Sequence, residues 1–337
     1  MQTQKQSVQL AVVFLALAAV IATVGYTMRK KSFTSASIGK LSFERTPERL
    51  ARGRYIVEGP AHCFQCHSDV DYTRPGAQAK PGKKGAGAIF AEDSMSWLVA
   101  PNITPDVETG AGSWTDEQLA RAIREGIGHD GRRLFPVMPY MNFRNMSDED
   151  LASVITYIRS IEPVRNVLPT TQIPEVLKGA LPPIQPITSA VSGPDLSSPV
   201  ARGKYLVTLG NCATCHTPMN QQGQPITEMA FGGGWQLKGP WGEVTSANIT
   251  PDPSGISYYD EDLFIKTLRT GHVGARKLNY VMPTGYFRNM NDDDLKAILA
   301  YLRTLPPVRH SVDNTEPPTF CPLDGTQHGF GEMNQKR

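Results

Sequence analysis

The strongest constraint on the fold is that the chain repeats itself. Five short blocks of the 337-residue sequence occur twice, in the same order. Ala51-Arg-Gly-Arg-Tyr-Ile-Val, for example, returns as Ala201-Arg-Gly-Lys-Tyr-Leu-Val. The other first copies begin at Cys63, Asn102, Val137 and Phe143, and their second copies begin at Cys212, Asn248, Val281 and Phe287. Matched blocks in one order predict a tandem duplication, in which two modules share one fold.

Helix signals recur at the same places in both copies. Thr46-Pro47 and Ser198-Pro199 each pair an N-cap residue with a proline at the first helical position. A last helix is expected to begin at Ser147 in the first copy and at Asn291 in the second, because apolar residues follow both at helical spacing. No long alternating strand pattern competes with these signals. The sequence therefore predicts a mostly α-helical protein.

Each copy contains one Cys-x-x-Cys-His motif. Cysteines at i and i+3 of a helical turn face the same side, so both thiols can bond the vinyl groups of one haem while the adjacent histidine reaches its iron. A zinc site and a thioredoxin-like dithiol are the alternatives, but a structural zinc site needs further Cys or His ligands, which neither copy offers nearby. The motifs predict two haem c groups, attached by Cys63, Cys66, Cys212 and Cys215 and ligated by His67 and His216.

A methionine occupies the same place in both copies and is the candidate for the second axial ligand. Met138 and Met282 lie in equivalent Val-Met-Pro segments just before the last helix. Methionine often only fills gaps in a core, which is the competing interpretation. The repeated position and the following proline favour a ligand loop. Met146 and Met290 also repeat, but they lie at the entry to the last helix and are interpreted as packing residues.

Two further features fit more than one interpretation. The block that begins at Asn102, and its copy at Asn248, suits either hydrogen bonds to haem propionates or a turn. Cys321 is the odd thiol once four cysteines are used in thioether bonds. It suits either a buried free cysteine or a tether to a partner subunit.

This combination of motifs resembles the class I cytochrome c family over residues 46–308. The resemblance rests on a first helix with Gly53 or Gly203, the Cys-x-x-Cys-His motif, the Met-Pro loop and a closing helix that ends in Tyr157-Ile-Arg or Tyr301-Leu-Arg. It implies that the first and last helices of each module cross at that glycine. The chain is also similar to cytochrome subunits of bacterial membrane-bound alcohol and gluconate-type dehydrogenases, and to membrane-anchored dihaem cytochromes that feed terminal oxidases. Those dehydrogenase subunits typically carry three haem modules, whereas this chain has two.

The N-terminal segment predicts a membrane anchor. Residues 8–28 lack charge, and a helix of about 20 apolar residues spans a bilayer core. A cleaved signal peptide is the competing interpretation. In bacteria the family attaches its haem outside the cytoplasmic membrane, so the resemblance implies a single-pass protein of the inner membrane with periplasmic haem domains. The cations at Arg29, Lys30 and Lys31 run against the positive-inside tendency.

The expected organisation has seven parts. They are a cytoplasmic N-terminus (1–7), a transmembrane anchor (8–28), a linker (29–45), a first cytochrome c domain (46–167), a Pro-rich linker (168–197), a second cytochrome c domain (198–310) and a C-terminal tail (311–337). The formal net charge of +2 argues against nucleic acid as a partner.

The expected function is electron transfer rather than enzymatic catalysis. Iron bound by both His and Met has no open position for a substrate, so it can only change its charge. The resemblance implies a subunit of a larger oxidoreductase complex, with a dehydrogenase or quinol-oxidising complex as donor and an oxidase or soluble cytochrome as acceptor. The alternative is a dihaem redox enzyme, such as a peroxidase or sulfur-compound oxidoreductase, with one open haem.

Overall fold

The computed structural model describes residues 41–71, 74, 76–90, 95–179, 181–239, 242–273, 276–312, 319–320 and 327–328. The predicted anchor over residues 8–28 lies outside this part of the chain, as does Cys321. Within the described residues, no helix has both the length and the apolar character that a membrane span requires. The anchor therefore stays a prediction.

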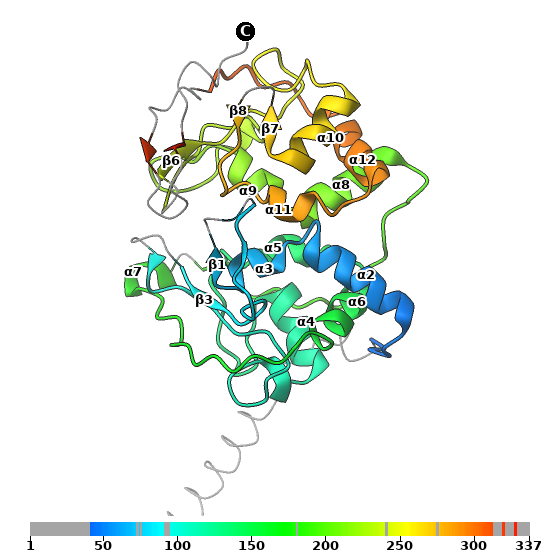
Figure 1. The fold of residues 1–337 in the computed structure, drawn as a ribbon, viewed down its shortest axis with the longest axis vertical. Helices are drawn as coiled ribbons and strands as arrows, with labels where there is room; N and C mark the ends of the chain where they lie inside the picture. The colour runs from blue at the N-terminus through cyan, green and yellow to red at the C-terminus, as the bar shows by residue number, and fades with distance from the viewer. Residues whose placement is uncertain are drawn as a thin grey trace, which may run out of the picture.

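The described part of the chain is mainly helical, with short antiparallel hairpins (Figure 1). The helices of the first repeat and the segment after it are α2 (Pro47–Glu58), α3 (Cys63–Cys66), η3 (Ala111–Ser113), α4 (Asp116–Glu125), α5 (Tyr140–Phe143), α6 (Asp148–Ile158) and α7 (Glu175–Lys178). Those of the second repeat are α8 (Pro199–Leu209), α9 (Cys212–His216), η4 (Thr227–Met229), α10 (Glu261–Thr270), α11 (Thr284–Phe287) and α12 (Asp292–Leu302).

The strands are two to four residues long and pair only with their neighbours along the chain. The antiparallel pairs are β1 (Val70–Asp71) with β2 (Gln78–Ala79), β3 (Ala88–Ile89) with β4 (Val99–Ala100), β5 (Gln236–Gly239) with β6 (Gly242–Thr245), β7 (His272–Val273) with β8 (Arg276–Lys277), and β9 (Thr319–Phe320) with β10 (Gln327–His328). These hairpins are too short to form a sheet core, so the helices carry the packing.

Crossed first and last helices organise each repeat, as the resemblance to the cytochrome c family implies. Helix α2 packs on α6 and α8 packs on α12. A Cβ placed on Gly53 would lie 1.9 Å from the carbonyl oxygen of Ser153, and one on Gly203 would lie 1.9 Å from that of Ala297. The crossing therefore requires glycine. The predicted N-caps are also confirmed, because the side chains of Thr46, Ser147, Ser198 and Asn291 each accept a hydrogen bond from the backbone N–H three residues later.

The two repeats pack against each other through reciprocal contacts (Figure 1). Tyr205 of α8 donates its hydroxyl to Asp150 Oδ2 at 2.7 Å and accepts from the backbone N–H of Ser147 at 3.0 Å. Tyr55, the counterpart of Tyr205 in α2, donates to Asp294 in the same way. The first helix of each repeat thus contacts the start of the other repeat's last helix, which is the pattern of a twofold interface.

Both carboxylates of this interface also hold an arginine of their own repeat. Arg52 Nε lies 2.7 Å from Asp150, and Arg202 forms the equivalent ion pair with Asp294. Asp150 and Asp294 are only 7% and 2% exposed. A carboxylate this buried is stable only when its oxygens are paired, so the Arg and Tyr partners account for the burial.

The segment between the repeats lies against the first repeat. Thr171 exchanges hydrogen bonds with the backbone of Val99, and the backbone N–H of Ile187 donates to Glu125 Oε1 at 2.9 Å. The backbone of Val191 accepts from Asp148 N at 2.9 Å. The proline content of residues 168–197 predicts a semi-extended segment. The sequence of this segment indicates neither the short helix α7 nor these contacts with the first repeat.

Candidate haem sites

The four motif cysteines lie on two short helices with the same geometry. Cys63 and Cys66 begin and end α3, and Cys212 and Cys215 lie three residues apart on α9. A left-handed residue enters each helix, with φ of 35° at His62 and 53° at Asn211. The i, i+3 spacing puts each thiol pair on one face of one turn, as two thioether bonds to a single haem require.

The thiols do not have the character of a redox dithiol. Burial raises the pKa of the Cys63 thiol to about 12, and that of Cys212 to about 12 as well. Reactive dithiol motifs instead depend on a lowered thiol pKa. Nor do the described residues contain a group of three or more His, Cys, Asp and Glu side chains that could hold a metal ion by themselves. Both alternatives to haem are therefore disfavoured.

Each motif histidine is oriented by a backbone carbonyl. His67 Nδ1 lies 2.8 Å from the carbonyl oxygen of Pro101, and His216 Nδ1 lies 2.7 Å from that of Ala247. Because a carbonyl can only accept, Nδ1 carries the proton, and the lone pair of Nε2 is left for an iron atom. Burial lowers the pKa of both imidazoles, which favours the neutral form that a metal ligand needs.

The repeated Asn-Ile-Thr-Pro-Asp block fixes the position of the two carbonyl groups that orient the histidines, those of Pro101 and Ala247. Asn102 is 3% exposed; its Oδ1 accepts from the backbone and side chain of Thr104, and its Nδ2 donates to the carbonyl of Val164 at 2.7 Å. Asn248 makes the equivalent bonds in the second repeat, including one to Val308 at 2.8 Å. The block is thus a turn tied to the segment after the last helix. Sequence reasoning missed that the residue before each asparagine orients the histidine, because any residue type offers a backbone carbonyl.

Each predicted axial methionine begins a tight turn, and the two turns are of the same type. The carbonyl of Met138 accepts from Tyr140 N at 2.8 Å, and that of Met282 accepts from Thr284 N at 2.7 Å. The proline between each pair has φ near −80° or −75° and ψ of 46°, close to an inverse γ-turn. Proline fixes its own φ, so the two turns share one backbone conformation.

The sites of each repeat converge on its core. Met138 and Cys63 are half-buried and pack against one apolar cluster, and Met282 and Cys212 pack against the other. Met146 and Met290, which the sequence assigns to packing, are each 1% exposed within these clusters. The structure thus brings the cysteine and methionine of each repeat to the same core, in which the packing methionines are fully buried.

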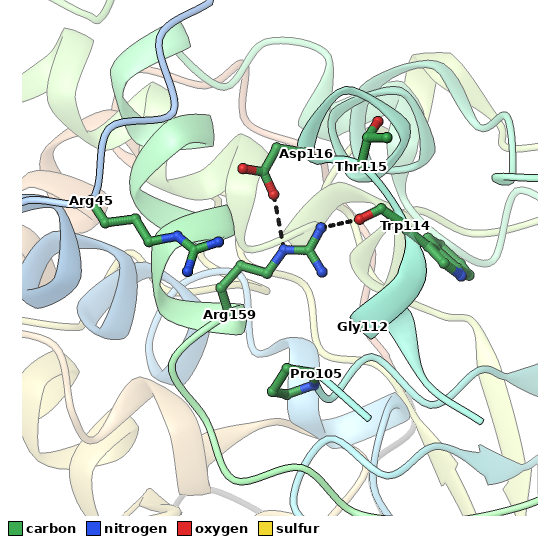
Figure 2. Close-up of a pocket in the computed structure, with 7 residues that line it drawn as sticks. All are labelled: Arg45, Pro105, Gly112, Trp114, Thr115, Asp116 and Arg159. Atoms are coloured by element: carbon green, nitrogen blue, oxygen red, sulfur yellow. Dashed lines mark hydrogen bonds and ion pairs between the residues drawn. The ribbon is translucent and has the colours of Figure 1, made fainter. Parts of the chain in front are cut away.

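Figure 2 shows an open pocket in the first repeat, and the interactions among its lining residues stabilise the fold. Arg159, at the end of α6, forms an ion pair with Asp116 at 2.9 Å and donates to the carbonyls of Ala111 and Trp114. These bonds fasten the last helix to the start of α4. The lining residues are Arg45, Pro105, Gly112, Trp114, Thr115, Asp116 and Arg159, and they include none of the predicted haem ligands.

Comparisons with known proteins agree with this geometry. A family model described as cytochrome c matches residues 50–162 and 200–306. The chain is 33% identical to the fructose dehydrogenase cytochrome subunit of Gluconobacter japonicus over 76% of this chain and 52% of that protein. It is 30% identical to the alcohol dehydrogenase (quinone) cytochrome c subunit of Gluconacetobacter polyoxogenes, over 85% of this chain and 63% of that one.

Another relative is matched over most of its own length. It is a diheme cytochrome c-type protein of Cereibacter sphaeroides, 28% identical over 73% of this chain and 82% of the relative. By contrast, the chain spans only 52% and 63% of the two dehydrogenase subunits.

Proposed function

This chain belongs to the cytochrome c family, and we propose that its two haem c groups relay electrons one at a time between protein partners. The observation that carries the proposal is the duplication of the site. Both repeats present a carbonyl-oriented histidine and a methionine in a proline-fixed turn. Two sites of the same design favour two closed electron carriers over one carrier and one open catalytic haem.

The proposed site residues have two roles, haem attachment and axial ligation. Cys63 and Cys66 attach the first haem, and Cys212 and Cys215 attach the second, while His67, Met138, His216 and Met282 are the axial ligands. Haem bound in this way supplies reversible one-electron chemistry, and a thioether ligand raises its reduction potential relative to a second histidine. The hydrogen bonds at Nδ1 hold the imidazoles in one tautomer and one orientation.

We also propose a place for the relay. The named dehydrogenase relatives support a membrane-associated dehydrogenase, or a quinol-oxidising complex, as the electron donor. The acceptor is a terminal oxidase or a soluble cytochrome. The haem domains face the periplasm of a bacterium, and residues 8–28 tether them to the inner membrane. Mild detergent extraction of the native membrane, followed by identification of the proteins that copurify, tests the donor.

Single replacements of the methionines test the proposed ligation. Met138→Ala and Met282→Ala should each remove half of the methionine–iron absorption band of the oxidised protein and make one haem bind carbon monoxide. Met146→Leu and Met290→Leu are matched controls, because these buried methionines pack in the same cores and should leave the band intact. A full band in Met138→Ala or Met282→Ala would contradict ligation at that site.

A further inference from the structure

The haem-attachment segment of the first repeat touches the methionine loop of the second. Gln65, which lies between Cys63 and Cys66, donates from Nε2 to the carbonyl oxygen of Val281 at 3.2 Å. Val281 directly precedes Met282, so the hydrogen bond ends on the peptide group that enters the methionine turn. The two proposed haem sites are thus joined by one side-chain amide.

Further contacts hold the same two segments together. The backbones of Gly76 and Gly285 meet so closely that a Cβ on Gly285 would lie 2.2 Å from the carbonyl oxygen of Gly76. The ring of His62 meets Phe287 edge-on, with centroids 5.5 Å apart. Residues on both sides of the first cysteine pair therefore contact residues that follow Met282, while Gln65 contacts the residue before it. Figure 1 shows α3 and α11 facing each other across the two repeats.

The reciprocal contact has a different form, although the rest of the interface is nearly twofold. The counterpart of Gln65 is Thr214, whose hydroxyl donates to Asn211 at 2.6 Å within its own repeat. The bond across the interface is made instead by Asn142 of α5, whose Nδ2 donates to Asn211. Val137, the counterpart of Val281, is 39% exposed, and so is Met141, the counterpart of Gly285. The first methionine loop thus keeps an exposed apolar surface where the second is covered.

The chemistry of the Gln65 contact suits a positioning role. The Val281 peptide is held from both sides, because its carbonyl accepts from Gln65 while the next N–H, that of Met282, donates to the carbonyl of Asn279 at 3.0 Å. The Gln65 Oε1 atom is buried and has no hydrogen-bond partner among the described residues.

We propose that Gln65 is a positioning residue for the axial methionine of the second haem, so that the first repeat stabilises ligation in the second. The inference rests on the proposed function, since it takes Met282 as the ligand. Loss of one neutral hydrogen bond should weaken the hold on the methionine loop, and an added ligand should then displace Met282 about fivefold more easily.

Imidazole, which competes with methionine for ferric iron, is the probe. In the Met138→Ala background the remaining methionine–iron band reports the second haem alone, and in Met282→Ala it reports the first. Adding Gln65→Ala should raise imidazole affinity about fivefold at the second haem and leave the first unchanged. Gln65→Met, which keeps the bulk but removes the donor, should act in the same way.

Thr214→Ala is the matched control and should leave the titration of the second haem unchanged, because its hydroxyl bonds within its own turn and not to the second methionine loop. An unchanged affinity at the second haem, or equal changes at both, would overturn the role of Gln65. Failure of the proposed function looks different, because the methionine–iron band would then persist in full in Met138→Ala or Met282→Ala before any imidazole is added.

Discussion

Replacing Gly53 by alanine tests the helix crossing on which each haem module depends. The new Cβ would lie 1.9 Å from the carbonyl oxygen of Ser153 and 2.9 Å from Cβ of Tyr157. Both obstacles belong to the adjoining helix, and the nearer one is backbone, so no side-chain rotation can relieve the clash. Helices α2 and α6 must instead separate by roughly 1 Å, which forfeits close packing along the whole crossing.

The size of the effect follows from two opposed contributions. Overpacking a well-filled core costs about 1–3 kcal/mol, and a clash against backbone belongs at the upper end. Alanine regains up to about 1 kcal/mol through its better helix propensity. We therefore expect Gly53→Ala to lower the free energy of unfolding by about 2 kcal/mol. Gly203→Ala should do the same in the second repeat, because its Cβ meets the carbonyl of Ala297 at the same 1.9 Å.

Denaturant unfolding of the haem-loaded protein, followed by far-UV circular dichroism, measures this change. Gly179→Ala is the control, since Gly179 has φ of −68° and nothing within 4 Å of an added Cβ. It should shift stability by no more than about 0.5 kcal/mol. If Gly53→Ala unfolded at the same denaturant concentration as the unaltered protein, the close crossing described here would be refuted.

Three further predictions concern the interface, the histidine support and the haem attachment. Tyr205→Phe should lower the free energy of unfolding by about 1–3 kcal/mol, because it leaves a buried carboxylate short of one hydrogen bond; equal stability in a denaturant titration would contradict this role. Asn102→Ala should loosen the carbonyl that orients His67, make the imidazole a weaker donor and raise the reduction potential of the first haem alone, which a spectroscopic redox titration measures; a shift at both haems would argue against local support. Replacing Cys63 and Cys66 together by alanine should reduce covalently bound haem from two per chain to one, as read from the intact mass, and two retained haems would disprove attachment at these thiols.

Local signals in the sequence predict a large part of this molecule. The duplication and the capped helices at Ser147 and Asn291 depend on residues close together in the chain or on a repeated pattern, whereas the crossing at Gly53 is implied by the resemblance to the cytochrome c family. Such features are readable because capping and close helix contact each demand a particular residue type.

Contacts between distant residues could not be predicted in the same way. Tyr205 and Asp150 are ordinary residues of amphipathic helices, and nothing local indicates that one repeat's hydroxyl reaches the other's carboxylate. The role of Pro101 as a hydrogen-bond acceptor for His67 is equally hidden, because any residue offers a carbonyl. The bond from Gln65 to Val281 depends on how the two repeats dock, which the repeat pattern does not specify.

The optical spectrum of the purified protein, oxidised and reduced, with carbon monoxide added to the reduced form, tests the central claim most directly. Two closed His/Met haems predict a methionine–iron band in the ferric spectrum that scales to two haems, and a ferrous spectrum that ignores carbon monoxide. Carbon monoxide binding to one haem would reveal an open or labile iron. That result would contradict the relay and would favour a dihaem redox enzyme instead.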